Sequence, residues 1–252
     1  GNKFEFRMLG SSQSIASPNV VLNTIMAQEL EEFADILEQS NDFQTDLQNL
    51  LHDTFKAHQR IIFNGNGYGE DWVQEAQRRG LSNLRDTVDC MPAYIDPKNI
   101  RLFAGHNILS ETEMRARYEI HLENYCKVTA IEASTLRDMV LRGILPAVNR
   151  YTADLTQAIL HKRELVVPCR VEEDLLQKLS ALTGSLYDTM AAINEAMDKA
   201  PDAEGGIDAA RYYREEIVRR MEEARQSIDQ MESLTAAKYW PYPTYADILF
   251  SV

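Results

Sequence analysis

Residues 171–197 read VEEDLLQKLSALTGSLYDTMAAINEAM, and this stretch decides the fold. Apolar residues recur there at the three- and four-residue spacing of one helix face, at Val171, Leu175, Leu179, Leu182, Leu186, Ile193 and Met197. Residues 200–206 contain a proline and two glycines, which indicate a turn. The helical spacing then returns at Ile217, Met221, Ala224, Ile228 and Met231. Two amphipathic helices joined by a short polar loop predict an antiparallel helical hairpin over residues 166–237.

Helical signals also dominate the chain before this hairpin. Asp42 is placed to cap a helix, and Ser110 with Glu113 has the spacing of a capping box. The section 81–105 contains two prolines and is expected to be mostly irregular. The fold class is therefore predicted to be mainly α.

One strand is expected at the beginning of the chain. Residues 3–9, KFEFRML, alternate polar and apolar side chains, which is the period of a half-buried strand. Because the chain opens at Gly1 without a methionine and is in an extended pattern two residues later, we expect it to be a piece of a longer protein.

The amino-acid composition disfavours some classes of binding partner for this chain. The 252 residues carry a formal net charge of −13, which disfavours nucleic acid and anionic membrane surfaces. No run approaches the roughly 20 apolar residues of a membrane-spanning helix. The three cysteines, Cys90, Cys126 and Cys169, lie far apart without a CxxC motif, which is typical of reduced thiols in a cytoplasmic protein.

The opening strand also carries the sharpest candidate for chemistry. Lys3, Glu5 and Arg7 project from one face of the strand while the two phenylalanines pack behind it. One carboxylate between two cations can hold a divalent metal while the cations bind phosphate. The alternative is a salt-bridged sheet surface, because alternating charges on an exposed sheet face are ordinary.

Three further features each allow a functional and a structural interpretation. Residues 65–69, GNGYG, fit either a phosphate-binding loop or a helix C-cap and turn. The five histidines lack the spacing of metal ligands, which favours structural roles. The aromatic and proline-rich residues 240–245 fit an exposed recognition peptide, or a tail that packs back on the body of the protein.

Several segments together resemble one enzyme family. The string GNKFEFRMLGSSQSIASPN at residues 1–19 resembles the late Glu-x-Arg strand and following loop of glutamine synthetases. The segments IIFNGNGY, NIRLF, TEMRARYEI and WPYPTYADILF resemble the type III branch of that family. The resemblance covers essentially the whole chain and identifies it as the C-terminal region of a type III glutamine synthetase.

The resemblance implies a role for each charged residue of the strand. Glu5 would be a ligand of the metal near the glutamate and the transferred phosphate. Arg7 would be catalytic, donating to that phosphate and to the acyl-phosphate intermediate. Lys3 stands where many relatives carry a nucleotide-side arginine, so it would bind the cofactor ATP without the bidentate fork of arginine. The order Pro18-Asn19 differs from the Asn-Pro of shorter family members.

The resemblance also divides the chain and implies its function. Residues 1–40 would end the catalytic α+β domain with one leftover strand, 41–165 would be a helical region, 166–237 the hairpin, and 238–252 an aromatic tail. The full-length enzyme would join ammonia to L-glutamate through a γ-glutamyl phosphate, using ATP and Mg²⁺ or Mn²⁺, as a cytoplasmic ring of identical subunits. We expect the fragment itself to be inactive, to bind no cofactor, and to serve structure or assembly. The alternative is a stand-alone helical interaction module without catalysis.

Overall fold

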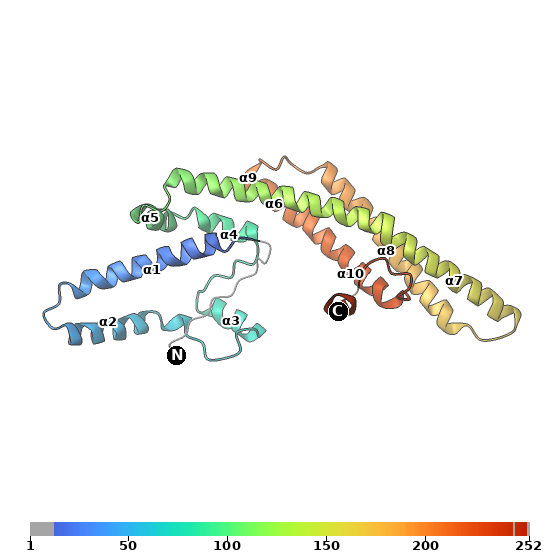
Figure 1. Cartoon of the computed structure of the whole chain (residues 1–252), viewed down its shortest axis with the longest axis horizontal. Helices are drawn as coiled ribbons and strands as arrows, with labels where there is room; N and C mark the ends of the chain where they lie inside the picture. The colour runs from blue at the N-terminus through green and yellow to red at the C-terminus, as the bar shows by residue number, and fades with distance from the viewer. Residues whose placement is uncertain (1–12, 244, 251–252) are drawn as a thin grey trace. The chain divides into compact units, whose positions relative to one another are not determined.

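The computed structural model describes residues 13–243 and 245–250, and every regular element in these ranges is a helix (Figure 1). The prediction of a mainly α fold is confirmed. The predicted strand at residues 3–9 lies outside the described residues. The chain divides into two compact units, one up to Tyr118 and one from Glu119, and the division falls inside helix α6.

The first unit holds short and medium helices. Its elements are α1 (Ala16–Leu37), α2 (Phe43–Ala57), the 3-10 turn η1 (Gln59–Ile61), α3 (Glu70–Arg78), α4 (Thr87–Tyr94) and α5 (Pro97–Gly105). Helix α1 packs against α2 and α5. His106 at the end of α5 reinforces the second contact, with Nε2 3.0 Å from Oε1 of Gln28 on α1.

The expectation of an irregular section at residues 81–105 is wrong, because α4 and α5 occupy most of it. Asp86 and Asp96 cap the two helices by accepting hydrogen bonds from backbone N–H groups in the first turn. Pro97 takes the first position of α5, where a missing N–H costs nothing. Pro97 therefore marks the start of a helix, whereas the sequence prediction treats it as a helix breaker.

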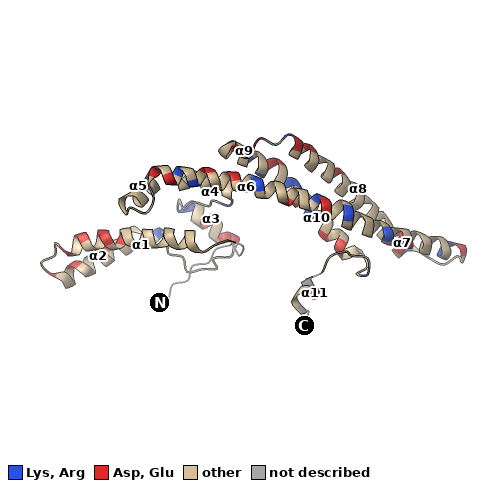
Figure 2. Ribbon diagram, turned by 45° about the horizontal axis from the view of Figure 1, so that its top comes forward, with Lys and Arg blue, Asp and Glu red and all other residues tan. Residues whose placement is uncertain are grey.

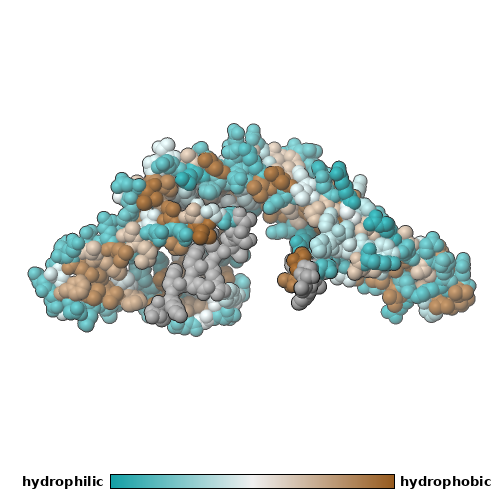
Figure 3. Space-filling view, viewed as in Figure 1, coloured by the Kyte–Doolittle hydropathy of each residue, from teal (hydrophilic) through white to brown (hydrophobic). Residues whose placement is uncertain are grey.

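Helix α1 exposes large apolar side chains on several of its faces, although acidic residues lie between them. Thr24 is the one residue buried in α1, although the helix is described over its whole length. Large apolar side chains on several faces of α1 are exposed: Val20, Val21, Ile25, Met26, Leu30 and Ile36. Figure 3 shows apolar side chains gathered over α1 and α2. Since gathered apolar side chains that remain exposed commonly mark contact sites, this surface is suited to contact with further protein.

Helix α6 crosses from the first unit into the second, which contains the long helix α8. After α6 (Glu111–Met139) come the π-helical turn η2 (Val140–Ile144), α7 (Leu145–Glu164), α8 (Arg170–Asp198), α9 (Gly206–Tyr212), the π-helical turn η3 (Tyr213–Val218), α10 (Arg219–Leu234) and α11 (Tyr245–Phe250). The capping box predicted at Ser110 is present, with the Ser110 N–H 2.8 Å from Glu113 Oε2 and the Glu113 N–H 3.3 Å from Ser110 Oγ.

The predicted hairpin is confirmed by the packing of α8 against α10. Its core is buried at the expected apolar spacing, by Leu179, Leu186, Met190 and Ile193 from α8 and by Ala224, Ile228 and Met231 from α10. Tyr212 ties the two arms near the turn, because its hydroxyl donates to the carbonyl of Ala196 at 2.9 Å. Helix α7 also packs on α8, so the hairpin has a third helix as a neighbour. Residues of both charge signs recur along these helices (Figure 2).

The start of the aromatic tail contacts the second unit, and within residues 240–245 Tyr242 makes a contact of the kind that the structural interpretation predicts. Tyr239 lies 5.2 Å, ring centroid to ring centroid, from Tyr151 of α7, and its hydroxyl bonds to Asp154. The hydroxyl of Tyr242 donates to the Met139 carbonyl at 3.4 Å, next to the π-helical turn η2. Among the described residues, no helix is long and apolar enough to cross a membrane.

Candidate functional site

The residues predicted to carry chemistry, Lys3, Glu5 and Arg7, lie outside the described residues. The structure therefore does not test the predicted roles of Glu5 as a metal ligand, Arg7 as a catalytic residue and Lys3 as a cofactor-binding residue. Within the described part of the chain, no three His, Cys, Asp or Glu side chains come together as a metal site. The glycine-rich segment 65–69 is described, and its surroundings form the best-defined polar cluster of the first unit.

Two aromatic rings close the base of the glycine-rich loop. Phe63 stacks on Trp72 of α3 with ring centroids 4.3 Å apart and planes inclined by 26°. Inside the loop, Asn66 accepts the Tyr68 N–H on its side-chain oxygen at 3.1 Å and the Gly69 N–H on its backbone carbonyl at 3.2 Å. The polar groups of Asn66 are thus used to shape the turn.

The helix C-cap predicted for this segment is wrong, whereas the predicted turn is present. Helix α2 already ends at Ala57, and the loop follows the short turn η1. Gly65, Gly67 and Gly69 do not adopt the left-handed conformation that a glycine cap uses, unlike Gly80 with φ of +71° after α3. The glycines instead form an open turn that leads into α3.

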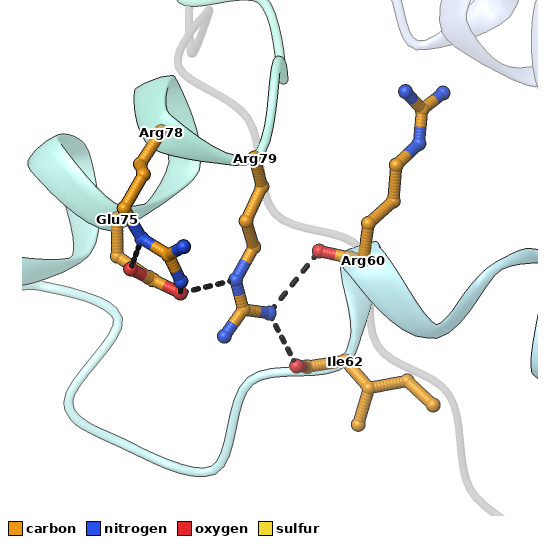
Figure 4. A network of polar contacts seen from close by, with 5 residues as sticks. All are labelled: Arg60, Ile62, Glu75, Arg78 and Arg79. Atoms are coloured by element: carbon orange, nitrogen blue, oxygen red, sulfur yellow. Dashed lines mark hydrogen bonds and ion pairs between the residues drawn. The ribbon is translucent and has the colours of Figure 1, made fainter.

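A carboxylate and two arginines fix α3 to the segment before the loop (Figure 4). Arg78 makes a two-pronged contact with Glu75, from Nε at 2.7 Å and from Nη2 at 2.6 Å. Arg79 donates from Nε to the same carboxylate at 2.5 Å. Its Nη1 reaches the carbonyls of Arg60 at 3.1 Å and Ile62 at 2.7 Å. The Arg79 guanidinium therefore contacts two residues that lie 17 and 19 positions before it in the sequence.

The charges in this cluster depend on one another. Hydrogen bonds from Arg78 and Arg79 lower the pKa of Glu75 from its ordinary 4.5 to about 2. The same carboxylate raises the pKa of Arg78. The Arg79 guanidinium also lies 5.7 Å from the centre of the Trp72 ring and 6.0 Å from that of Phe63. Arg79 thus holds the stacked aromatic pair and the backbone in one arrangement.

An open recess of about 440 Å³ adjoins the cluster, lined by Gln59, Arg60, Ile62, Asn64, Arg78 and Arg79. Three guanidinium groups against the single carboxylate of Glu75 leave a local excess of positive charge in an acidic chain. Such a recess favours anionic groups. The sequence analysis does not predict these arginines as site residues, although the four-residue spacing from Glu75 to Arg79 indicates an ion pair along a helix.

Comparison with known proteins gives a consistent result along the chain. Residues 46–163 match the family model described as the glutamine synthetase C-terminal domain. The chain is 34% identical to a glutamine synthetase of Butyrivibrio fibrisolvens, over 100% of this chain and 36% of that protein. It is 33% identical to the type-3 glutamine synthetase of Dictyostelium discoideum, over 99% of this chain and 35% of that protein. A glutamine synthetase of Bacteroides fragilis (strain YCH46) is 29% identical over 100% of this chain and 36% of that protein. The chain thus spans little more than a third of the length of these curated relatives.

Proposed function

Because the chain corresponds to the C-terminal region of a type III glutamine synthetase, we propose that the complete protein is an ATP-dependent ligase that joins ammonia to L-glutamate. The observation that carries this proposal is the alignment of the whole chain with glutamine synthetases. In the proposed reaction the glutamate carboxylate attacks the γ-phosphorus of ATP, ADP leaves, and ammonia displaces phosphate from the γ-glutamyl phosphate.

In this proposal the opening segment of the chain supplies part of the active site. Arg7 would bind the transferred phosphate, Lys3 would contact the nucleotide, and Glu5 would give one carboxylate to a divalent ion. A bound Mg²⁺ or Mn²⁺ neutralises charge at a transferring phosphate. The described residues do not make up a metal site, so the other ligands would come from the remainder of the full-length protein.

We assign the part of the chain that follows this opening segment to structure and assembly rather than to chemistry. The exposed apolar surface of α1 and α2 supports this role, because it is suited to packing on the remainder of the protein. In the same proposal, residues 1–40 end the catalytic domain, 41–165 form a helical region, 166–237 the hairpin and 238–252 the tail. The assembled protein would be a ring of identical subunits in the cytoplasm, where the three unpaired cysteines remain thiols.

The test of the proposed site is Glu5→Ala in the full-length protein. We expect kcat to fall by a factor on the order of 10² or more and metal affinity to weaken, because a charge that stabilises the transition state is lost. Glutamine formation is measured across a metal titration. Glu111→Ala is the control, because among the described residues this exposed glutamate pairs with Arg115 of its own helix. Unchanged kinetics and metal dependence in Glu5→Ala would show that the strand is an ordinary charged sheet surface.

A further inference from the structure

The glycine-rich loop contains both Asn-Gly pairs of the chain, Asn64-Gly65 and Asn66-Gly67. Both asparagines are exposed. The side-chain amide of an asparagine can be attacked by the backbone nitrogen of the next residue. Glycine as that next residue leaves the approach open, because it has no Cβ. The loop therefore holds two candidates for the same reaction, and their surroundings differ.

The Asn66 side chain is held beside the peptide unit that would attack it. Its Oδ1 accepts a hydrogen bond from the Tyr68 N–H at 3.1 Å. This bond closes a ring that includes the side-chain carbon Cγ and the Gly67 nitrogen, so the two reacting atoms are kept in one small turn. The Tyr68 N–H also points at the oxygen on which negative charge develops when the nitrogen adds to Cγ, and such a donor stabilises that charge.

The Gly67 nitrogen is available as the nucleophile. Among the described residues, the Gly67 N–H makes no hydrogen bond, so no such bond has to break before it reacts. In the same part of the chain, no atom beyond the two neighbouring residues lies within 4 Å of the place where a Cβ of Gly67 would be. Tyr68 beside it is 90% exposed. The peptide unit can therefore turn toward the Asn66 side chain, and water reaches the loop.

The first pair, Asn64-Gly65, has a different environment. The Asn64 side chain accepts no hydrogen bond from a described residue, in contrast to Asn66. A Cβ on Gly65 would overlap the ring of Phe63, so the Gly65 backbone packs directly on that ring. Phe63 is fixed in turn by its stacking on Trp72 at 4.3 Å between ring centroids. Rotation of the peptide unit after Asn64 is therefore obstructed.

We propose that Asn66 is a site of spontaneous deamidation, at which the Gly67 nitrogen displaces ammonia from the side-chain amide. The Gly67 nitrogen forms a bond to Cγ, the bond from Cγ to the amide nitrogen breaks, and the proton of the Gly67 N–H leaves with the ammonia. Water then opens the resulting succinimide at either of its carbonyl carbons. The products are aspartate and isoaspartate, and in isoaspartate the main chain runs through Cγ. This inference is independent of the proposed ligase activity.

Formation of isoaspartate would alter the turn that leads into α3. The Asn66 backbone carbonyl accepts the Gly69 N–H at 3.2 Å, immediately before α3 begins at Glu70. In isoaspartate this carbonyl becomes part of a free carboxylate, and the main chain gains one carbon atom. The turn therefore changes its length, and the stacking of Trp72 on Phe63 should loosen as isoaspartate accumulates.

The two asparagines serve as each other's control. Trypsin cuts after Arg60 and after Arg78, so one peptide, residues 61–78, carries both of them. The natively folded full-length protein is incubated at neutral pH, and tandem mass spectrometry locates the mass gain of deamidation. We expect Asn66 to convert faster than Asn64 by about tenfold or more, because Asn66 is preorganised for the attack. In the urea-unfolded protein the two rates should be similar. Equal rates in the folded protein, or an Asn66 that does not convert, would overturn the proposal.

Gly67→Ala tests the attack by the backbone nitrogen. The described residues leave space for this Cβ, and the φ of Gly67 is outside the left-handed region, so the variant should keep the wild-type melting temperature. The Cβ obstructs the nitrogen, so conversion of Asn66 should slow by roughly tenfold. Isoaspartate is detected by enzymatic methylation of its free carboxylate. An unchanged rate in Gly67→Ala, or a product that contains aspartate without isoaspartate, would show direct hydrolysis of the amide and contradict the proposed route.

Discussion

A single carboxylate, Glu75, organises the charged cluster beside the glycine-rich loop. A carboxyl group whose pKa is lowered on folding stabilises the folded state above its ordinary pKa of 4.5, and that stabilisation is lost as pH falls towards about 2. We therefore expect the loop to loosen between pH 4.5 and 2. Trp72 fluorescence in a Trp240→Phe background reports this, because Trp72 stacks on Phe63 above Arg79. Glu75→Gln should remove the transition and leave the loop looser at pH 7.

The matched control for this prediction is Glu111→Gln. Glu111 pairs with Arg115 at 2.8 Å along one helix, and both side chains are more than half exposed. No bond from this pair reaches another segment in the hydrogen bonds and ion pairs of the described residues. The Trp72 signal should therefore keep its wild-type pH dependence. A wild-type transition in Glu75→Gln would show that the Glu75 carboxyl does not hold the loop.

The pairing of Glu75 with Arg79 could be read from the sequence, because four-residue spacing on a helix brings the two side chains together. The hydrogen-bond acceptors on the other side of Arg79 could not be predicted from the sequence. The carbonyls of Arg60 and Ile62 become available only through the path of the intervening loop, which local spacing does not determine. Val166 shows the same limit, since no propensity scale places a valine at positive φ.

Whole helices were easier to predict than their irregularities. The hairpin of α8 and α10 followed from its apolar period, because burial of one face is the dominant constraint on a long helix. The π-helical turns at Val140–Ile144 and Tyr213–Val218 were missed. A π turn adds one residue to a helical turn without a characteristic composition. Helices α4 and α5 were missed because their prolines outweighed the aspartate caps at Asp86 and Asp96.

Two helical glycines allow a direct comparison between helices. Gly184 on α8 has open space where a Cβ would lie, so Gly184→Ala should stabilise the protein by about 0.5–1 kcal/mol. At Gly143 in η2, a Cβ would lie 2.6 Å from the Tyr242 hydroxyl. Gly143→Ala should therefore stabilise the protein less than Gly184→Ala does, or destabilise it. Denaturant unfolding of each variant measures the difference.

The cause of that difference is checked by a double-mutant cycle with Tyr242→Phe. Removal of the hydroxyl leaves the nearest ring atom of residue 242 at 3.2 Å from the added Cβ. In the Tyr242→Phe background, Gly143→Ala should therefore recover much of the stabilisation expected of alanine in a helix. Additive free energies of unfolding would mean that the tail does not rest on η2. The cycle therefore tests the docking of the aromatic tail as well as the glycine.

The 252-residue chain should not catalyse glutamine formation by itself. It spans only 35–36% of the length of its curated relatives, and the proposed site residues at its beginning are one carboxylate and two cations. We expect no ATP-dependent glutamine formation at saturating Mg²⁺ or Mn²⁺, because the remaining groups of the site would lie in the rest of the protein. The full-length protein under the same conditions is the positive control. Any γ-glutamyl transfer by a clean preparation of the 252 residues would contradict this assignment.

The order of the helices in the second unit has a consequence for how quickly it forms. Its main contacts join elements that are close along the chain, α7 with α8 and α8 with α10. Little loop-closure entropy is lost before such contacts form, and helical proteins of this kind fold in microseconds to milliseconds. The second unit should therefore reach its native packing soon after its chain is free to collapse. The apolar faces of its hairpin are then exposed only briefly, which shortens the time in which unfolded copies can aggregate.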